Sequence, residues 1–161
     1  MSLFNFWKKE NSFTDPQFGE FTLEKPLYKG YKQSYEKELE LECGKVRVSL
    51  RTKKCIETFR VLYGSFDEFL KNATHFAAEQ LIDLANYEWG YIPWKDENPD
   101  ASDEDYIMIT KEEFTERISL RYLDFKENNE YYLEYDDGNI FLGHRIHVHG
   151  NLEAGFIEAN I

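Results

Sequence analysis

The strictest constraint on the fold of this chain is the alternation of apolar and polar residues. Residues 38–42 read ELELE and residues 46–51 read VRVSLR, with a turn at Cys43-Gly44-Lys45 between them. A period of two directs alternate side chains to opposite faces, so each run predicts a strand with one buried face. The first run is acidic and the second is basic. We therefore expect a hairpin whose solvent face is stabilised by cross-strand charge pairs.

The same patterning predicts two β-rich regions at opposite ends of the chain. Residues 14–62 are expected to form strands and turns. Residues 119–161 predict a meander of antiparallel strands, with strand candidates at 120–125, 130–135, 140–149 and 156–161. Asp137-Gly138 is a strong hairpin signal, because glycine adopts positive φ without a steric penalty. The supply of 13 Phe, 11 Tyr and 3 Trp also suits a half-buried sheet surface.

The middle of the chain carries the helical signals. Apolar residues recur at helical spacing from Phe66 to Ala85, which predicts one long helix over 65–87. Ser65 and Glu68 have the spacing of a capping box at its start. A second capping box, from Thr110 to Glu113, predicts a short helix over about 111–118.

These elements predict an α+β fold in a single domain over residues 1–161. Its antiparallel sheet is a meander of hairpins from both chain ends, packed on one long helix plus a short helix. The domain divides into a β-rich part over 14–62, a helical part over 65–118 that includes an acidic loop, and a β-meander over 119–161.

The net charge of −12 limits the classes of partner. A field of that sign repels nucleic acid and anionic membranes, so we expect neither as a partner. One basic run interrupts the acidic chain, and we interpret it as a solvated strand face. Its cations, which are opposed only by Glu57, are Lys45, Arg47, Arg51, Lys53, Lys54 and Arg60.

The cysteines and the apolar runs favour a reducing compartment. Cys43 and Cys55 form no CxxC motif, and no stretch is long and apolar enough for a membrane span or a signal peptide. We expect a cytoplasmic protein with two free thiols and no cofactor.

The segment GHRIHVHG, residues 143–150, raises the question of a metal site. In a strand over 140–149, His144 would point into the apolar face, where a buried imidazole is a candidate acid or base. His147 and His149 would share the other face. Placing residue 149 opposite 156 brings Glu158 across from His147, and two histidines with one carboxylate form a ligand set for zinc or iron. Arg145 on the same face opposes a dication, and a solvated strand face explains the same residues.

The segment DENPDASDED, residues 96–105, is the densest cluster of acids. It lacks the glycine and the final glutamate of an EF-hand calcium loop. We interpret it as a docking surface for a basic protein partner. The candidate binding residues are Asp96, Glu97, Asp100, Asp103, Glu104 and Asp105.

Several motifs resemble those of a family of uncharacterised bacterial proteins, domain-of-unknown-function family twenty-two sixty-two. The similar segments are YDDGNIFLGH at 135–144, GNL at 150–152, GFIEA at 155–159, and FWKK and DPQFG near the N-terminus. The family pattern has an aromatic residue where Leu142 stands and no consistent histidines at 147 and 149. The resemblance implies a bacterial origin and no accepted activity. Small acidic bacterial proteins of this kind are considered, by analogy, as toxin-neutralising immunity proteins.

Two functions follow as hypotheses. The first is a non-enzymatic binding module, monomeric or homodimeric, whose acidic surface steers a basic protein partner. The alternative is a metal-dependent enzyme that uses His147, His149 and Glu158, with His144 beside the metal ligands.

Overall fold

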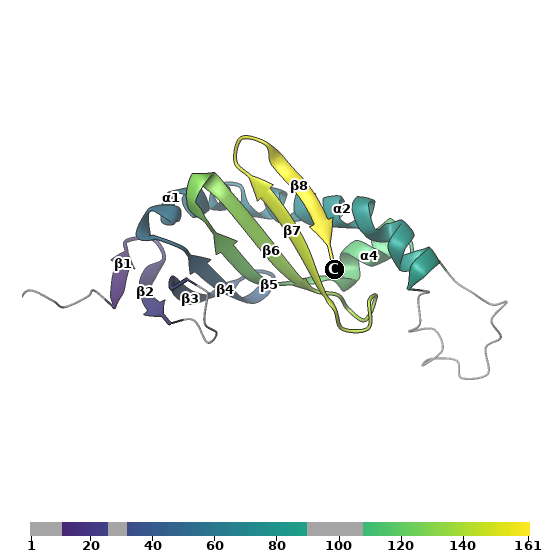
Figure 1. Cartoon of the computed structure of the whole chain (residues 1–161), viewed down its shortest axis with the longest axis horizontal. Coiled ribbons are helices and arrows are strands. Elements are labelled where there is room, and N and C mark those ends of the chain that lie inside the picture. Colours follow the sequence, from purple (N-terminus) through teal and green to yellow (C-terminus); the bar gives the residue numbers. More distant parts are fainter. Residues whose placement is uncertain (1–10, 26–31, 90–107) are drawn as a thin grey trace, which may run out of the picture.

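The computed structural model describes residues 11–25, 32–89 and 108–161. Strands β1 to β8 form one eight-stranded sheet in which spatial order follows chain order. Figure 1 shows this sheet with its helices behind it. The strand bounds are β1 Ser12–Asp15, β2 Gly19–Glu24, β3 Ser34–Leu41, β4 Gly44–Leu50, β5 Ser119–Phe125, β6 Glu130–Asp136, β7 Arg145–Asn151 and β8 Gly155–Asn160.

All neighbouring strands pair antiparallel except β4 and β5, which run parallel. The parallel pair arises because the helical middle of the chain connects these two strands and returns the chain to the same end of the sheet. The predicted α+β class is confirmed, with this one departure from antiparallel pairing. The β3–β4 hairpin has the predicted register, and Lys45 Nζ lies 3.4 Å from Glu38 Oε1 across it.

The helical part differs from the prediction at its start. The helical elements are the 3-10 turns η1 Lys53–Cys55 and η3 Glu127–Asn129, the π-helical turn η2 Leu84–Glu88, and the helices α1 Ile56–Tyr63, α2 Phe66–Asp83 and α4 Lys111–Arg117. The expectation that residues 53–62 form strands and turns was therefore wrong. Burial of Ile56 and Phe59 on one side of α1 outweighs the weak helix propensity of its β-branched and aromatic residues.

The two predicted capping boxes have different outcomes. The Ser65 side chain makes no capping hydrogen bond, so that box was wrong. The Thr110 box is confirmed: the Glu113 amide donates to Thr110 Oγ1 at 3.1 Å, and the Thr110 amide donates to Glu113 Oε2 at 2.8 Å.

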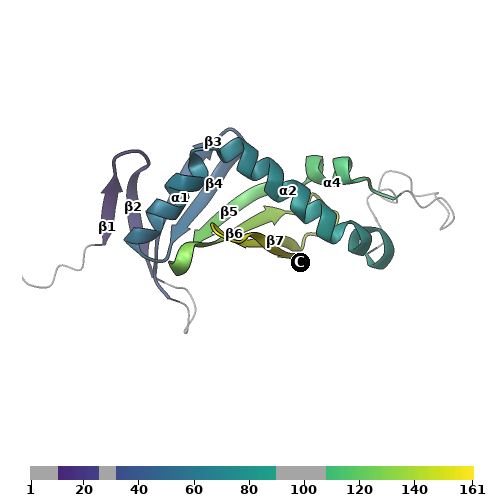
Figure 2. The same ribbon diagram turned by 90° about the horizontal axis from the view of Figure 1, so that it is seen from above.

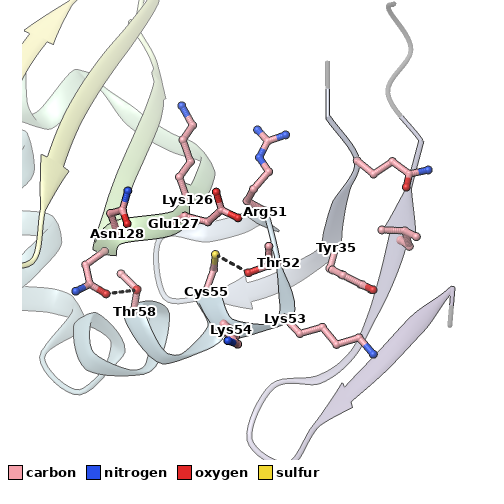
Figure 3. Close-up of a pocket in the computed structure, with 13 residues that line it drawn as sticks. Tyr35, Arg51, Thr52, Lys53, Lys54, Cys55, Thr58, Lys126, Glu127 and Asn128 are labelled. Carbon is pink, nitrogen blue, oxygen red and sulfur yellow. Dashed lines mark hydrogen bonds between the residues drawn. The ribbon is translucent and has the colours of Figure 1, made fainter. Parts of the chain in front are cut away.

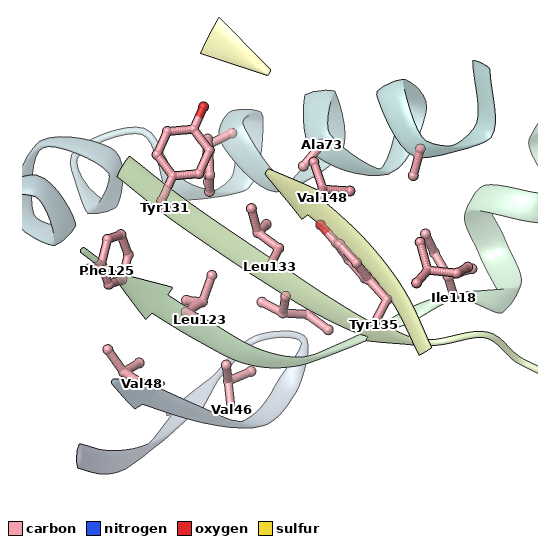
Figure 4. Packing of buried hydrophobic residues seen from close by; sticks show 14 of the residues in the cluster. Val46, Val48, Ala73, Ile118, Leu123, Phe125, Tyr131, Leu133, Tyr135 and Val148 are labelled. Atoms are coloured by element: carbon pink, nitrogen blue, oxygen red, sulfur yellow. The ribbon is translucent and has the colours of Figure 1, made fainter. Parts of the chain in front are cut away.

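The described helices pack on one face of the sheet (Figure 2). Burial alternates along β6, where Tyr131, Leu133 and Tyr135 face the helices and the residues between them do not. Figure 4 shows these side chains among Val46, Val48, Leu123 and Val148 from the neighbouring strands, with Ala73 on α2 across the layer. The opposite face of the sheet therefore presents polar side chains.

The β6–β7 connection corrects the predicted strand over 140–149, because β7 begins only at Arg145. The Asp137 carboxylate, 1% exposed, accepts hydrogen bonds from the backbone amides of Asn139, Phe141 and Gly143 at 3.1, 2.6 and 3.0 Å. Leu142 and Gly143 have φ of 56° and 86°, which is incompatible with an extended strand. Residues 137–144 therefore form a loop organised around one buried carboxylate.

Candidate functional site

The predicted acidic residues Asp96, Glu97, Asp100, Asp103, Glu104 and Asp105 lie outside the described residues. The structure describes the elements that flank this part of the chain. The Asn86 carboxamide donates to the Ile109 carbonyl at 3.1 Å and accepts from the Ile109 amide at 2.9 Å. Both residues are buried, so this paired hydrogen bond joins η2 to the residues before α4 within the fold.

The helical elements on either side of the acidic segment are themselves acidic. The C-terminal half of α2, together with η2 and α4, carries the exposed carboxylates Glu79, Asp83, Glu88, Glu112, Glu113 and Glu116. The cations on these elements are Lys111 and Arg117. α4 packs against α2, and Lys111 Nζ lies 3.9 Å from Glu79 Oε1. We name the six carboxylates the acidic surface.

His144 is exposed, and the prediction that it enters the apolar core was wrong. It precedes β7 because the Asp137 loop continues to this point in the chain. Its ring meets Trp89 edge-on, with 5.0 Å between ring centroids.

His147 and His149 lie on the polar face of β7, as alternation predicts. The predicted register with β8 was wrong: His149 pairs with Glu158, and His147 pairs with Asn160. This two-residue displacement has two sources: the hairpin closes with Asn151 opposite Gly155, one residue later than predicted, and a register shift between His149 and Gly150 adds the second residue. Among the described residues, no group of three or more His, Cys, Asp or Glu side chains is arranged to hold a metal ion.

The polar face also holds His149 in an aromatic cluster. Its ring stacks on Tyr132 with centroids 4.3 Å apart, and Lys126 Nζ lies 3.6 Å from the centroid of the same tyrosine. Nearby, Ser49 Oγ donates to Asp124 Oδ1 at 2.9 Å. Burial raises the pKa of Tyr122 to about 12, so at neutral pH this phenol is a hydrogen-bond donor and not a base.

A pocket of about 1000 Å³ lies where β4 and β5 end, and we name it the basic pocket. Figure 3 shows its lining, which comes from β2, the start of β3, the residues that directly follow β4 and β5, and η1, α1 and η3. The lining residues are Leu23, Gln33, Tyr35, Arg51, Thr52, Lys53, Lys54, Cys55, Thr58, Lys126, Glu127, Asn128 and Asn129. This set contains four cations and one carboxylate. The lining of the pocket is therefore positively charged, although the net charge of the chain is negative.

Backbone hydrogen bonds fix the two strand ends that frame the basic pocket. The Arg51 amide donates to the Phe125 carbonyl, and the Lys126 amide donates to the Glu130 carbonyl, each at 2.9 Å. Asn128 and Asn129 have φ of 61° and 62°, so both lie in the left-handed region. Thr58 Oγ1 donates to Asn129 Oδ1 at 3.3 Å and connects α1 to this turn.

The basic pocket could be predicted only in part from the sequence. The run of cations from Lys45 to Arg60 predicts a solvated strand face, which is wrong for η1 and α1. Lys126, Asn128 and Asn129 were missed, because only the parallel pairing of β4 and β5 brings them to Arg51.

The architecture defines an α+β protein in which a helical layer covers one face of an eight-stranded, mostly antiparallel sheet. A family model described as an uncharacterised protein conserved in bacteria (DUF2262) matches residues 15–161, so the chain belongs to that family. No curated protein and no solved structure matches the chain. No helix among the described residues has the length and apolar character needed to cross a membrane.

Proposed function

We propose that this protein is a non-enzymatic binding module that docks a basic protein partner in the bacterial cytoplasm. The acidic surface and the acidic segment 96–105 form the docking region. The observation that carries the proposal is the group of six exposed carboxylates on α2, η2 and α4, where hydrogen bonds between Asn86 and Ile109 join η2 to the residues before α4.

The physical argument is electrostatic. Exposed carboxylates on one side of a protein of net charge −12 raise the encounter rate with a cationic surface, and salt reduces the effect. Charges on helices that pack against the sheet are held in a fixed arrangement, which favours specific docking over diffuse attraction. Toxin neutralisation is one form that such docking takes in small acidic bacterial proteins.

The test uses two variants with equal changes of charge. The acidic-surface variant neutralises exposed residues of α2 and α4: Glu79→Gln, Asp83→Asn, Glu112→Gln and Glu116→Gln. The control variant neutralises exposed residues of β2 and β3: Glu20→Gln, Glu24→Gln, Glu38→Gln and Glu40→Gln. Partners are captured from bacterial lysate on the immobilised wild-type chain, identified by mass spectrometry and purified for calorimetry.

We expect a partner with a basic isoelectric point whose Kd rises by about tenfold in the acidic-surface variant, a loss of roughly 1.4 kcal/mol. The control variant should bind as the wild type does. A partner that binds both variants equally, or whose Kd is indifferent to salt between about 50 and about 500 mM, would contradict the proposal.

A further inference from the structure

We propose that the basic pocket binds a phosphorylated small molecule, with the phosphate held by Arg51 and Lys126. The remainder of the ligand packs against Leu23 and Tyr35 on the β2–β3 side of the pocket. This site is separate from the acidic surface and does not depend on the function proposed above.

The first argument is charge. The lining of the pocket includes Arg51, Lys54 and Lys126 with one carboxylate, Glu127, in a chain whose net charge is −12. Within the described part of the chain, no carboxylate forms an ion pair with Arg51, Lys54 or Lys126. Lys126 instead lies over the Tyr132 ring, and a cation–π contact of this kind positions an ammonium group without neutralising it. An anionic ligand would supply the missing negative charge.

The second argument is position. Arg51 and Lys126 directly follow the parallel strands β4 and β5, and Figure 3 shows both side chains extending to the same side of the strand ends. The carboxyl ends of parallel strands are the preferred ligand sites of open sheets, because the chain diverges there and leaves a crevice.

The rim of the pocket is a fixed turn. Asn128 and Asn129 have positive φ in the connection between β5 and β6, a conformation that asparagine adopts readily in turns. The hydrogen bond from Thr58 to Asn129 holds this turn against α1.

The chemistry of the lining indicates the ligand class. A guanidinium and ammonium groups suit a phosphate, which takes several charge-assisted hydrogen bonds at once. The volume of about 1000 Å³ accommodates a ligand larger than inorganic phosphate. Leu23 and Tyr35 provide an apolar wall for that larger part, and the hydroxyls of Thr52 and Thr58 add neutral polar groups.

The experiment is a titration of the ¹⁵N-labelled full chain, followed by amide chemical shifts, with phenyl phosphate, inorganic phosphate and phenol as probes. Phenyl phosphate should cause saturable shifts at residues 51–55 and 126–129, with a lower Kd than inorganic phosphate. Phenol should cause none. Wild-type protein that shows no saturable shift at these residues with either phosphate would overturn the proposal.

Two double variants test the assignment of the cations. Arg51→Gln with Lys126→Gln should raise the Kd for phenyl phosphate by about tenfold or more, since hydrogen bonds between charged groups are the strong ones. Lys45→Gln with Arg121→Gln removes the same charge from exposed positions outside the pocket and should change the Kd by less than about twofold. Equal Kd values in the two double variants would overturn the proposal. Arg51→Lys retains the charge, so its Kd for phenyl phosphate should lie between that of the wild type and that of Arg51→Gln. This intermediate Kd separates loss of a ligand contact from a general loss of folding.

Discussion

At the scale of single residues, two buried carboxylates fix turns by accepting hydrogen bonds from backbone amides. Asp15 accepts from the amides of Gln17 and Phe18 at 2.9 and 3.0 Å and also pairs with Arg60. Asp137 accepts from three amides of the β6–β7 loop. Both carboxylates are almost fully shielded from water, at 3% and 1% exposed. Removing either would leave buried donors without an acceptor.

Asp137→Ala should therefore destabilise the fold. We expect the free energy of unfolding to fall by about 3 kcal/mol, because hydrogen bonds to a charged acceptor contribute roughly 1.5–3 kcal/mol each and their effects are not additive. Urea denaturation at neutral pH measures the change. The matched control is Asp83→Ala on the exposed face of α2, which should change stability by less than about 0.5 kcal/mol. A similar small effect for both variants would show that the loop does not depend on its carboxylate.

Asp15 predicts a specific pH dependence. Burial raises the pKa of its carboxyl, but the hydrogen bonds from the Phe18 and Gln17 amides and the charge of Arg60 outweigh burial, so the pKa lies below the ordinary value of 3.8. A pKa that is lower in the folded state contributes stability that is fully present above the unfolded-state value. That contribution is lost as pH falls through the folded-state value.

We expect the wild type to lose stability relative to Asp15→Asn as pH falls below about 4, because only the wild type must protonate this carboxylate. Thermal unfolding from about pH 6 to about pH 2.5 measures the difference between the two proteins. At neutral pH the variant should be the less stable by roughly 2 kcal/mol, since it leaves the Arg60 guanidinium without its buried partner. A stability difference that is constant with pH would contradict the lowered pKa.

At the scale of elements, the sequence predicted the strands and helices whose positions depend on local periodicity. Strands β3 to β6 and helix α4 lie close to their predicted positions, because alternation and the Thr110 box are local signals. Helix α1 was missed because residues 56–63 are rich in β-branched and aromatic types, and only burial against the sheet favours the helix. The delayed start of β7 depends on a carboxylate contact that periodicity does not report.

The candidate site was less predictable than the fold. Arg51 and Lys126 are separated by a long stretch of chain and meet only through the parallel pairing of β4 with β5, which a prediction of antiparallel hairpins excludes. The predicted pairing of His147 with Glu158 was also wrong, because the β7–β8 turn closes one residue later than predicted and a register shift between His149 and Gly150 adds another residue.

Asn86→Ala tests the hydrogen bonds that join η2 to Ile109, just before α4. The substitution leaves the amide and carbonyl of buried Ile109 without their partner, at a cost of about 1–3 kcal/mol for each unsatisfied group. We expect the free energy of unfolding to fall by about 2 kcal/mol and amide exchange to accelerate at the start of α4. Asn72→Ala, at an exposed position of α2, is the control and should leave both quantities nearly unchanged. Unchanged exchange at Ile109 in the Asn86 variant would rule out this anchor.

At the scale of the whole molecule, charge is unevenly distributed. The basic pocket holds four cations, and the acidic surface holds six carboxylates of a chain with 31 acidic and 19 basic residues. Repulsion among exposed carboxylates opposes the compact state and is screened by salt. The buried pair between Asp15 and Arg60 is screened much less, so added salt should relieve the repulsion and leave that attraction largely intact.

Raising sodium chloride from about 10 to about 100 mM shortens the Debye length from about 30 to about 10 Å and should therefore stabilise the fold. We expect the midpoint of thermal unfolding to rise by about 3 °C, which corresponds to roughly 1 kcal/mol for a chain of this size. The buffer must contain no phosphate, because a phosphate bound in the basic pocket would stabilise the protein by mass action and mimic screening. The acidic-surface variant should show a smaller rise than the wild type, since it has lost part of the repulsion. A midpoint that falls with salt would mean that attractive pairs between surface charges outweigh the repulsion. The acidic surface would then already be neutralised within the fold, and it would be poorly suited to a basic partner.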